Sequence, residues 1–166
     1  MLTLTPTQLM VMQAHAEAAY PKECCGLLLG IQERSRDLRW VKQVSPLSND
    51  WQPAQPDLPN LDDTEPTSLS KRNRYWVDPI ALMSAQRMAR DRGWIVLGVF
   101  HSHPDHPAIP SAYDRQLAWI EYSYPILSVC NGQLTDWHSW RFDEAGNTWE
   151  ETIEILPETL PQSESR

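Results

Sequence analysis

The stretch Gly98-Val-Phe-His101-Ser-His103-Pro-Asp-His-Pro-Ala-Ile-Pro-Ser111-Ala-Tyr-Asp114 decides both the fold and the chemistry of this chain. The apolar run 94–97 just before it is typical of a buried strand. If that strand continues to His103, the side chains of His101 and His103 project from one face, because strand residues alternate between faces. Ser111 and Asp114 have the spacing of a helix start. The stretch therefore predicts a strand, a proline-rich loop and a helix.

The residue types in this stretch are those that bind zinc. Two histidines on one face of a strand lie about 6–7 Å apart at their Cα atoms and can converge on one ion. Asp114, in the first turn of the helix, is placed to supply a third ligand. This set leaves a fourth coordination position open, as in catalytic zinc sites. Each part also has an ordinary alternative, since a His-x-His pair can be incidental and Ser-x-x-Asp is a common helix cap.

The order of these parts resembles the JAMM/MPN-plus metalloprotease family, and most closely its short, stand-alone prokaryotic members. In that family, His-Ser-His-Pro followed by Ser-x-x-Asp is accompanied by an upstream glutamate. Here the stretch Tyr20-Pro-Lys-Glu23-Cys-Cys-Gly-Leu-Leu supplies that glutamate. The resemblance covers most of the chain, and no position of the motif is missing.

The resemblance implies a role for each motif residue. His101, His103 and Asp114 are implied to ligate Zn²⁺, and Glu23 to carry the proton of the attacking water. Ser111 is implied to donate a hydrogen bond to the oxyanion, although one geometry cannot fully serve both that role and helix capping. The implied reaction is hydrolysis of the amide bond after the C-terminal Gly-Gly of a ubiquitin-like or sulfur-carrier protein. The alternative is a non-catalytic MPN-type scaffold, but such modules typically lose the metal ligands that this chain has.

Other hydrolase classes find little support in the sequence. It has no Gly-x-Ser-x-Gly elbow, no His-Glu-x-x-His helix and no zinc-deaminase signature. Cys25 is an alternative nucleophile in principle, but a thiol inside an apolar strand is expected to be inert. His106 is expected to be a surface residue without a metal role.

The composition limits partners and location. A net charge of −8 argues against nucleic acid as a partner, because binding phosphates requires a basic face. No window is apolar enough for a transmembrane helix, and no secretory signal is visible, so we expect no membrane association. The three cysteines do not make a disulfide framework, which favours a cytoplasmic location.

Alternating helices and strands predict a single α/β domain over residues 1–156, with a curved, mixed or mainly antiparallel sheet flanked by helices. The resemblance implies the same fold. Helices are predicted from Thr5 to about residue 19, from Asp78 to Arg92 and from Ser111 to about Ser123. Strands are predicted over 23–31, 38–44, 74–77, 94–103, 126–130, 134–142 and 148–155, the last of them an edge strand.

Two segments are predicted to lie outside this framework. Residues 45–71 are rich in Pro and Asp and are interpreted as an insertion, either a partner-contacting lid or a disordered loop. Residues 157–166 are polar and are predicted to be a disordered tail.

Overall fold

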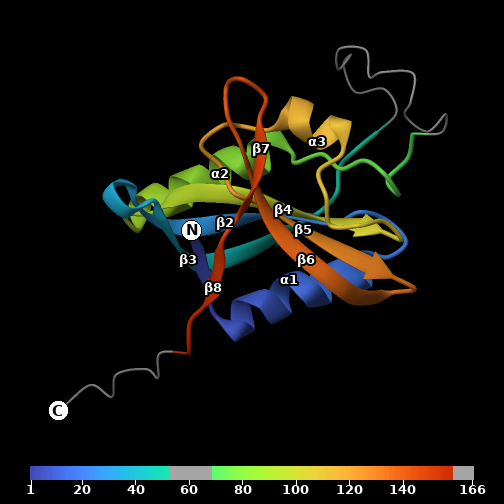
Figure 1. The fold of residues 1–166 in the computed structure, drawn as a ribbon, viewed down its shortest axis with the longest axis horizontal. Coiled ribbons are helices and arrows are strands. Elements are labelled where there is room, and N and C mark those ends of the chain that lie inside the picture. Colours follow the sequence, from blue (N-terminus) through green and yellow to red (C-terminus); the bar gives the residue numbers. More distant parts are fainter. Residues whose placement is uncertain (53–68, 159–166) are drawn as a thin grey trace.

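The computed structural model of this chain describes residues 1–52 and 69–158, and Figure 1 shows how they are arranged. In these residues eight strands form one sheet, accompanied by three α-helices and one short 3-10 helix. The elements, in chain order, are β1 (Leu2–Leu4), α1 (Pro6–Ala19), β2 (Cys25–Glu33), η1 (Arg34–Arg36), β3 (Leu38–Leu47), α2 (Pro79–Asp91), β4 (Ile95–Pro104), α3 (Ala112–Leu117), β5 (Tyr124–Cys130), β6 (Gln133–Phe142), β7 (Thr148–Glu151) and β8 (Ile153–Ile155).

The sheet is mixed and curved. Its strand order is β7-β6-β5-β4-β2-β3-β1-β8. The pairs made by β2 and by β6 are antiparallel, whereas β4–β5, β1–β3 and β1–β8 are parallel. Only Thr152 separates β7 from β8 in the chain, yet these strands lie at opposite ends of the order, so the sheet must curl until its ends meet. The predicted fold class is confirmed.

The prediction of one edge strand over 148–155 is wrong, because this stretch completes both ends of the sheet. Glu151, at the end of β7, is buried and accepts hydrogen bonds from Arg39 on β3 (3.1 Å) and from Ser139 on β6 (3.0 Å). Arg39 is buried as well. The ion pair joins residues 112 positions apart in the chain, so local periodicity could not reveal it.

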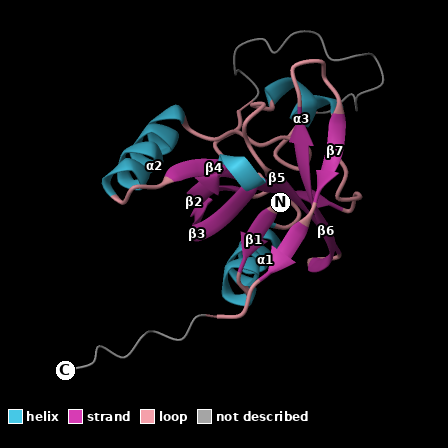
Figure 2. Cartoon of the chain, turned by 60° about the vertical axis from the view of Figure 1, so that its left-hand side comes forward, coloured by secondary structure: helices cyan, strands magenta, loops and turns pink. Residues whose placement is uncertain are grey.

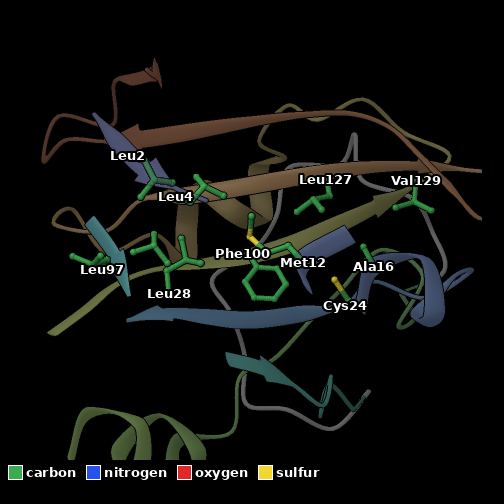
Figure 3. Packing of buried hydrophobic residues seen from close by; sticks show 11 residues of the cluster. Leu2, Leu4, Met12, Ala16, Cys24, Leu28, Leu97, Phe100, Leu127 and Val129 are labelled. Carbon is green, nitrogen blue, oxygen red and sulfur yellow. The ribbon is translucent and has the colours of Figure 1, made fainter. Parts of the chain in front are cut away.

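The helices divide between the two faces of the sheet. Figures 1 and 2 show α1 on one face and α2 and α3 on the other. The core consists of two clusters of buried hydrophobic residues, one on each face of the sheet. The first, drawn in Figure 3, packs Met12 of α1 against Phe100 of β4. The second gathers Ala85 and Ala89 of α2 with strand residues of the opposite face. Because Phe100 points towards α1, the alternation of β4 turns His101 towards the side of α2 and α3.

Two helix starts follow their predicted capping patterns. Thr5 and Gln8 form a capping box at the start of α1, and the Asp78 carboxylate accepts two backbone N–H groups in the first turn of α2. Gly93, with φ of 68°, follows the end of α2, where a left-handed residue is usual. These local signals were sufficient because the capping partners are three residues apart or fewer.

The third helix is shorter than predicted and ends at Leu117 instead of about Ser123. The chain from Ser123 onwards is drawn onto β4, where Ser123 N–H donates to Leu97 O (2.9 Å) and Val99 N–H donates to Ser123 O (3.1 Å). Gly98 permits this approach, since a Cβ atom there would lie 1.9 Å from the Ser123 carbonyl oxygen. Pairing with β4 therefore takes priority over helix continuation.

The predicted strand over 74–77 is also wrong, because these residues form no regular element. Their backbone bonds to another loop: the Asn49 amide donates to Arg74 O (2.9 Å) and accepts from Trp76 N–H (3.2 Å), while Asp50 N–H donates to Trp76 O (3.1 Å). The short strand β1 was not predicted.

The predicted insertion and tail fall largely outside the described residues. β3 continues to Leu47, so residues 45–47 of the segment 45–71 belong to the sheet, and residues 53–68 lie outside the description. Of the predicted tail, residues 159–166 also lie outside it, whereas Glu158 accepts a hydrogen bond from Thr7 N–H (2.8 Å).

Candidate metal centre

The strand β4 presents His101 and His103 side by side, as the sequence predicted. It lies between β2 and β5, with His101 opposite Cys25 on one side and Ile126 on the other. Both imidazoles are buried, His101 completely. A strand paired on both sides holds its backbone rigidly, and the two-residue spacing places both rings on the face covered by α2 and α3.

The start of α3 brings Asp114 to the two histidines. Ser111 caps this helix: its hydroxyl accepts from Asp114 N–H (3.2 Å), and its own backbone N–H donates to Asp114 Oδ2 (2.7 Å). This reciprocal capping box fixes the carboxylate in the first turn, where the helix dipole also favours a negative charge.

The three side chains form a triangle of possible ligand atoms. The Nε2 atoms of His101 and His103 are 3.1 Å apart. His101 Nε2 lies 3.2 Å from Asp114 Oδ1, and His103 Nε2 lies 3.3 Å from Asp114 Oδ2. A tetrahedral ion about 2.1 Å from each ligand requires ligand atoms about 3.4 Å apart, so the triangle has the right size for zinc. Within 1–52 and 69–158 this is the one such group of His, Cys, Asp or Glu residues.

The hydrogen bond of His103 prepares it as a ligand. Its Nδ1 lies 2.8 Å from Pro107 O, and because a carbonyl can only accept, Nδ1 must carry the proton. In the neutral imidazole this leaves a lone pair on Nε2, which faces His101 and Asp114. Metal-bound histidines are usually oriented by such a bond from the other ring nitrogen.

His101, His103 and Asp114 shift one another's pKa values. Burial acts to raise the pKa of Asp114, but the charges and hydrogen bonds of His101 and His103 hold it well below its usual value. Burial lowers the pKa of His101. Burial acts in the same direction on His103, yet the hydrogen bond and charge of Asp114 and the charge of Glu23 raise its pKa to about 9. In the metal-free site a proton on His103 therefore balances the buried carboxylate, and a bound cation would replace that proton.

Glu23 lies two residues before Cys25, the first residue of β2, and is 7% exposed. Its backbone is held by Lys71 O, which accepts from its N–H (2.7 Å), and by the Asn49 amide, which donates to its carbonyl (3.0 Å). The next residue, Cys24, donates its N–H to the hydroxyl of Ser102 (2.8 Å), which lies between the two histidines of β4. Hydrogen bonds thus connect the residues before β2 to β4, through Ser102, and to two loops, through Asn49 and Lys71.

The environment of Glu23 suits proton transfer. Glu23, His103 and Ser111 line one cleft of about 280 Å³, together with Arg72 and Arg74. Burial raises the pKa of Glu23 to about 8, with Asp114 adding to the effect while His103 and Arg74 oppose it. A group whose pKa lies near neutrality can both accept and donate a proton.

The hydroxyl of Ser111 is committed to its neighbour in this structure. Ser111 Oγ donates to Asp114 Oδ2 (2.7 Å) while it accepts from Asp114 N–H, so its proton points at the carboxylate. The anticipated conflict between capping and oxyanion stabilisation is therefore visible in the hydrogen bonds.

The alternative thiol nucleophile is not supported by the geometry. Cys24 and Cys25 are both buried, in separate core clusters on opposite faces of the sheet. Burial raises the pKa of each thiol to about 12, so neither forms a thiolate near neutral pH. His106 lines the cleft but belongs to no ligand group among the described residues.

Two residues near the site carried no signal in the sequence. Tyr75 stacks on His101, and Asn49 joins Glu23 to the backbone on either side of Tyr75. An aromatic residue in a short apolar run and an asparagine in a polar loop are both ordinary in sequence. Their roles depend on contacts between segments that are far apart in the chain.

The fold and site can now be compared with known proteins. The family described as prokaryotic homologs of the JAB domain matches residues 7–143. The chain is 34% identical to the desampylase of Haloferax volcanii over 125 residues, which is 75% of this chain and 73% of that protein. It is 32% identical to a probable TtuB-protein conjugate cleaving protease of Thermus thermophilus over 117 residues, 70% of this chain and 63% of that protein. The solution structure of a protein from Desulfitobacterium hafniense superposes with a TM-score of 0.73 and 36% identity, covering 95% of this chain and 94% of the other.

This chain belongs to the prokaryotic JAB family, the stand-alone JAMM type, and the predicted family is confirmed. The predicted enzyme class, a JAMM-type protease, is confirmed with it. None of the helices among the described residues is long and apolar enough to cross a membrane. The cytoplasmic location remains a prediction.

Proposed function

We propose that this chain is a zinc-dependent isopeptidase that hydrolyses the amide bond after the C-terminal glycine of a ubiquitin-like or sulfur-carrier protein. The observation that carries the proposal is the buried triangle of His101, His103 and Asp114, of which His103 lines the same cleft as the buried acid Glu23. Three ligands with an open fourth position, next to a carboxyl group of raised pKa, are the parts that a hydrolytic metal site requires.

His101 and His103 would hold the metal through Nε2, and Asp114 through a carboxylate oxygen. The nitrogen–oxygen donor set and the 3.1–3.3 Å spacing suit zinc. Bound there, zinc would supply Lewis-acid chemistry, making an attacking water more acidic and polarising the scissile carbonyl.

Glu23 is the proposed proton carrier. Its carboxylate takes a proton from the attacking water as the new C–O bond forms, and delivers it to the departing nitrogen as the C–N bond breaks. Ser111 is proposed to stabilise the oxyanion by hydrogen bonding. Since its hydroxyl donates to Asp114 in this structure, that role requires the proton to turn outward into the cleft.

The proposed partner class follows from the two named relatives. One is a desampylase and the other a probable TtuB-protein conjugate cleaving protease, and this chain is similar to both over more than two thirds of its length. We extend the prediction of a carrier with a C-terminal Gly-Gly to this chain, because a flexible tail without side chains can enter a narrow cleft and bind by its backbone. The non-catalytic scaffold is the weaker candidate, since all five motif residues are present and four of them are buried.

The test measures zinc content and cleavage in one preparation. Protein purified without chelator should carry about one zinc per chain, and should cleave a ubiquitin-like protein joined through its C-terminal glycine to a lysine side chain. Chelation should abolish cleavage and zinc should restore it. A carrier whose last glycine is replaced by valine is the matched control and should resist cleavage. A chain that takes up no zinc even when zinc is supplied would favour the scaffold instead.

A further inference from the structure

The two histidines of the triangle are held by different means. His103 is oriented by the hydrogen bond from its Nδ1 to Pro107 O (2.8 Å). Nδ1 of His101 is buried and has no hydrogen-bond partner among residues 1–52 and 69–158. Metal-bound histidines almost always donate a hydrogen bond from the second ring nitrogen, which sets the orientation of the ring. Among the described residues, no hydrogen bond to Nδ1 orients the ring of His101, so its packing contacts are the restraint to consider.

The ring of Tyr75 lies flat against His101. Their centroids are 4.5 Å apart and their planes differ by 22°, which is a stacked arrangement. Tyr75 is 5% exposed and His101 is completely buried, so the stacked rings are shielded from solvent. Rotation of the imidazole out of its plane would drive its edge into the face of the tyrosine ring. The stack thus limits the direction in which Nε2 can point.

Tyr75 is itself anchored to the element that carries the third ligand. Its carbonyl accepts a hydrogen bond from the hydroxyl of Tyr113 (3.1 Å), the residue directly before Asp114 on α3. The ring of Tyr113 meets the ring of Tyr75 edge to face, and the Arg74 guanidinium lies over the Tyr113 ring at 4.5 Å. Tyr75 therefore contacts His101 through its ring and the start of α3 through its backbone.

A second anchor comes from Asn49. Its side-chain amide donates to Arg74 O (2.9 Å) and accepts from Trp76 N–H (3.2 Å), so it binds the backbone on both sides of Tyr75. The segment 74–76 has no regular secondary structure, and these bonds contribute to holding it in place. Hydrogen bonds on both sides of Tyr75 restrict the backbone of this irregular segment and so limit where the tyrosine side chain can lie.

We propose that Tyr75 is a positioning residue for the metal centre: by stacking on His101 it orients this ligand, as the Pro107 carbonyl orients His103. The inference rests on the proposed function, because it takes His101 as a metal ligand. It assigns a role in zinc affinity to an aromatic residue outside the ligand motif. Tyr75 also lines an apolar pocket of about 350 Å³ with Leu82 and Tyr124, so a role in core packing alone is the competing explanation.

The experiment measures zinc affinity by competition with a chromophoric chelator, together with the melting temperature of the metal-free protein. Tyr75→Met keeps most of the buried volume but removes the flat face. We expect it to weaken zinc binding by about 10- to 100-fold, the range found when groups that orient metal ligands are removed. Tyr75→Phe keeps the ring and should bind zinc within about twofold of the parent.

Tyr124→Met is the matched control. Tyr124 lines the same apolar pocket and is buried to a similar extent, but its ring contact is with Phe142 and not with a metal ligand. It should lower the melting temperature without changing zinc affinity. Should Tyr75→Met affect only the melting temperature, as this control does, Tyr75 would be a packing residue and the inference would be overturned.

A second variant covers the case in which Tyr75→Met does not fold. Tyr113→Phe removes only the hydrogen bond to the Tyr75 carbonyl and should weaken zinc binding measurably but by less than about 10-fold, because the ring of Tyr75 still faces His101. Unchanged affinity in a protein that has lost this anchor would contradict the inference. Failure of the parent to bind zinc would instead overturn the proposed function, so the two failures are distinguishable.

Discussion

The metal triangle and the Glu23 side of the cleft are assembled in different ways. All three proposed ligands come from the single stretch 101–114, and the capping box at Ser111 and the bond to Pro107 lie inside that stretch as well. The Glu23 backbone is bonded to Asn49 and Lys71, and the next residue, Cys24, is bonded to Ser102 of β4, so three segments far from residue 23 in the chain position it. The proposed ligands and their hydrogen bonds are thus close together in sequence, whereas the position of Glu23 depends on contacts between segments far apart in the chain.

This difference suggests that metal binding and catalysis can be separated by mutation. Substitutions of the proposed ligands should reduce both zinc binding and turnover, because the chemistry requires the metal. Changes on the Glu23 side should affect turnover while the metal stays bound. The following predictions test that division, beginning with the largest expected effect.

Replacement of His103 by alanine should abolish zinc retention. The remaining two ligands cannot compete with water for the ion, and the buried Asp114 loses a partner that lies 3.3 Å away. Zinc content measured after gel filtration should fall from about one per chain to near zero. A variant that retains as much zinc as the parent would refute the ligand assignment.

Glu23→Gln should leave zinc bound but stop most of the chemistry. Glutamine has the same size and can hydrogen bond, yet it cannot take a proton at neutral pH. Turnover on a Gly-Gly-linked conjugate should fall by about 10²–10⁴, the usual value of general acid–base catalysis. Loss of zinc together with activity would make Glu23 a ligand, and unchanged activity would make it a simple strand-end acid.

Asn49→Asp should give an intermediate effect on the same side of the cleft. Aspartate keeps the acceptor for Trp76 N–H but loses the donor that binds the carbonyls of Glu23 and Arg74. We expect a loss of about 1–3 kcal/mol in the free energy of unfolding, because two part-buried carbonyl groups each lose the hydrogen bond from Asn49. Turnover should fall by about tenfold. Zinc content measured with excess zinc should not change, although zinc affinity should weaken slightly because Asn49 also anchors the segment that carries Tyr75. A variant that loses zinc would show that the two sides are coupled.

The stability of the metal-free protein should fall with rising pH, and Glu23→Gln should reduce that fall. The pKa of Glu23 is raised by burial to about 8 in the folded state, above its ordinary value of 4.5. A raised pKa stabilises the fold fully below the unfolded value, and this contribution is lost as pH rises through 8. At pH 8 the metal-free variant should therefore be more stable than the metal-free parent, by more than about 1 kcal/mol.

Urea unfolding in the presence of a chelator at pH 5 and pH 8 measures this effect. Parallel changes in the parent and in Glu23→Gln would show that other groups, and not Glu23, dominate the pH dependence.

The smallest effect on the metal site is expected from shortening the chain between the anchored loops. The sequence predicts an insertion over 45–71, but residues 45–47 lie in β3, and Asn49 and Lys71 bind Glu23. Replacement of residues 53–68 by a short Gly-Ser linker should leave zinc content and melting temperature near the parent values, while changing which conjugates are cleaved. Loss of the fold would show that the segment belongs to the core.

Much of the ligand side could be predicted because its determinants are short in range. A strand forces residues two apart onto one face, and a capping box acts over three residues, so the convergence of His101, His103 and Asp114 could be predicted from their spacing. The glutamate was found by resemblance to a family motif and not by its local pattern. The cap of α1 at Thr5 and that of α2 at Asp78 were predicted for the same local reason.

The tertiary structure alone decided the features that depend on distant partners. The stacking of Tyr75 on His101, the anchoring of Glu23 by Asn49 and the closure of the sheet by Arg39 and Glu151 each join separate parts of the chain. The early end of α3 follows in the same way from pairing with β4. Hydrophobic periodicity and capping record only what neighbouring residues prefer, whereas these contacts form only after the whole sheet has brought the segments together.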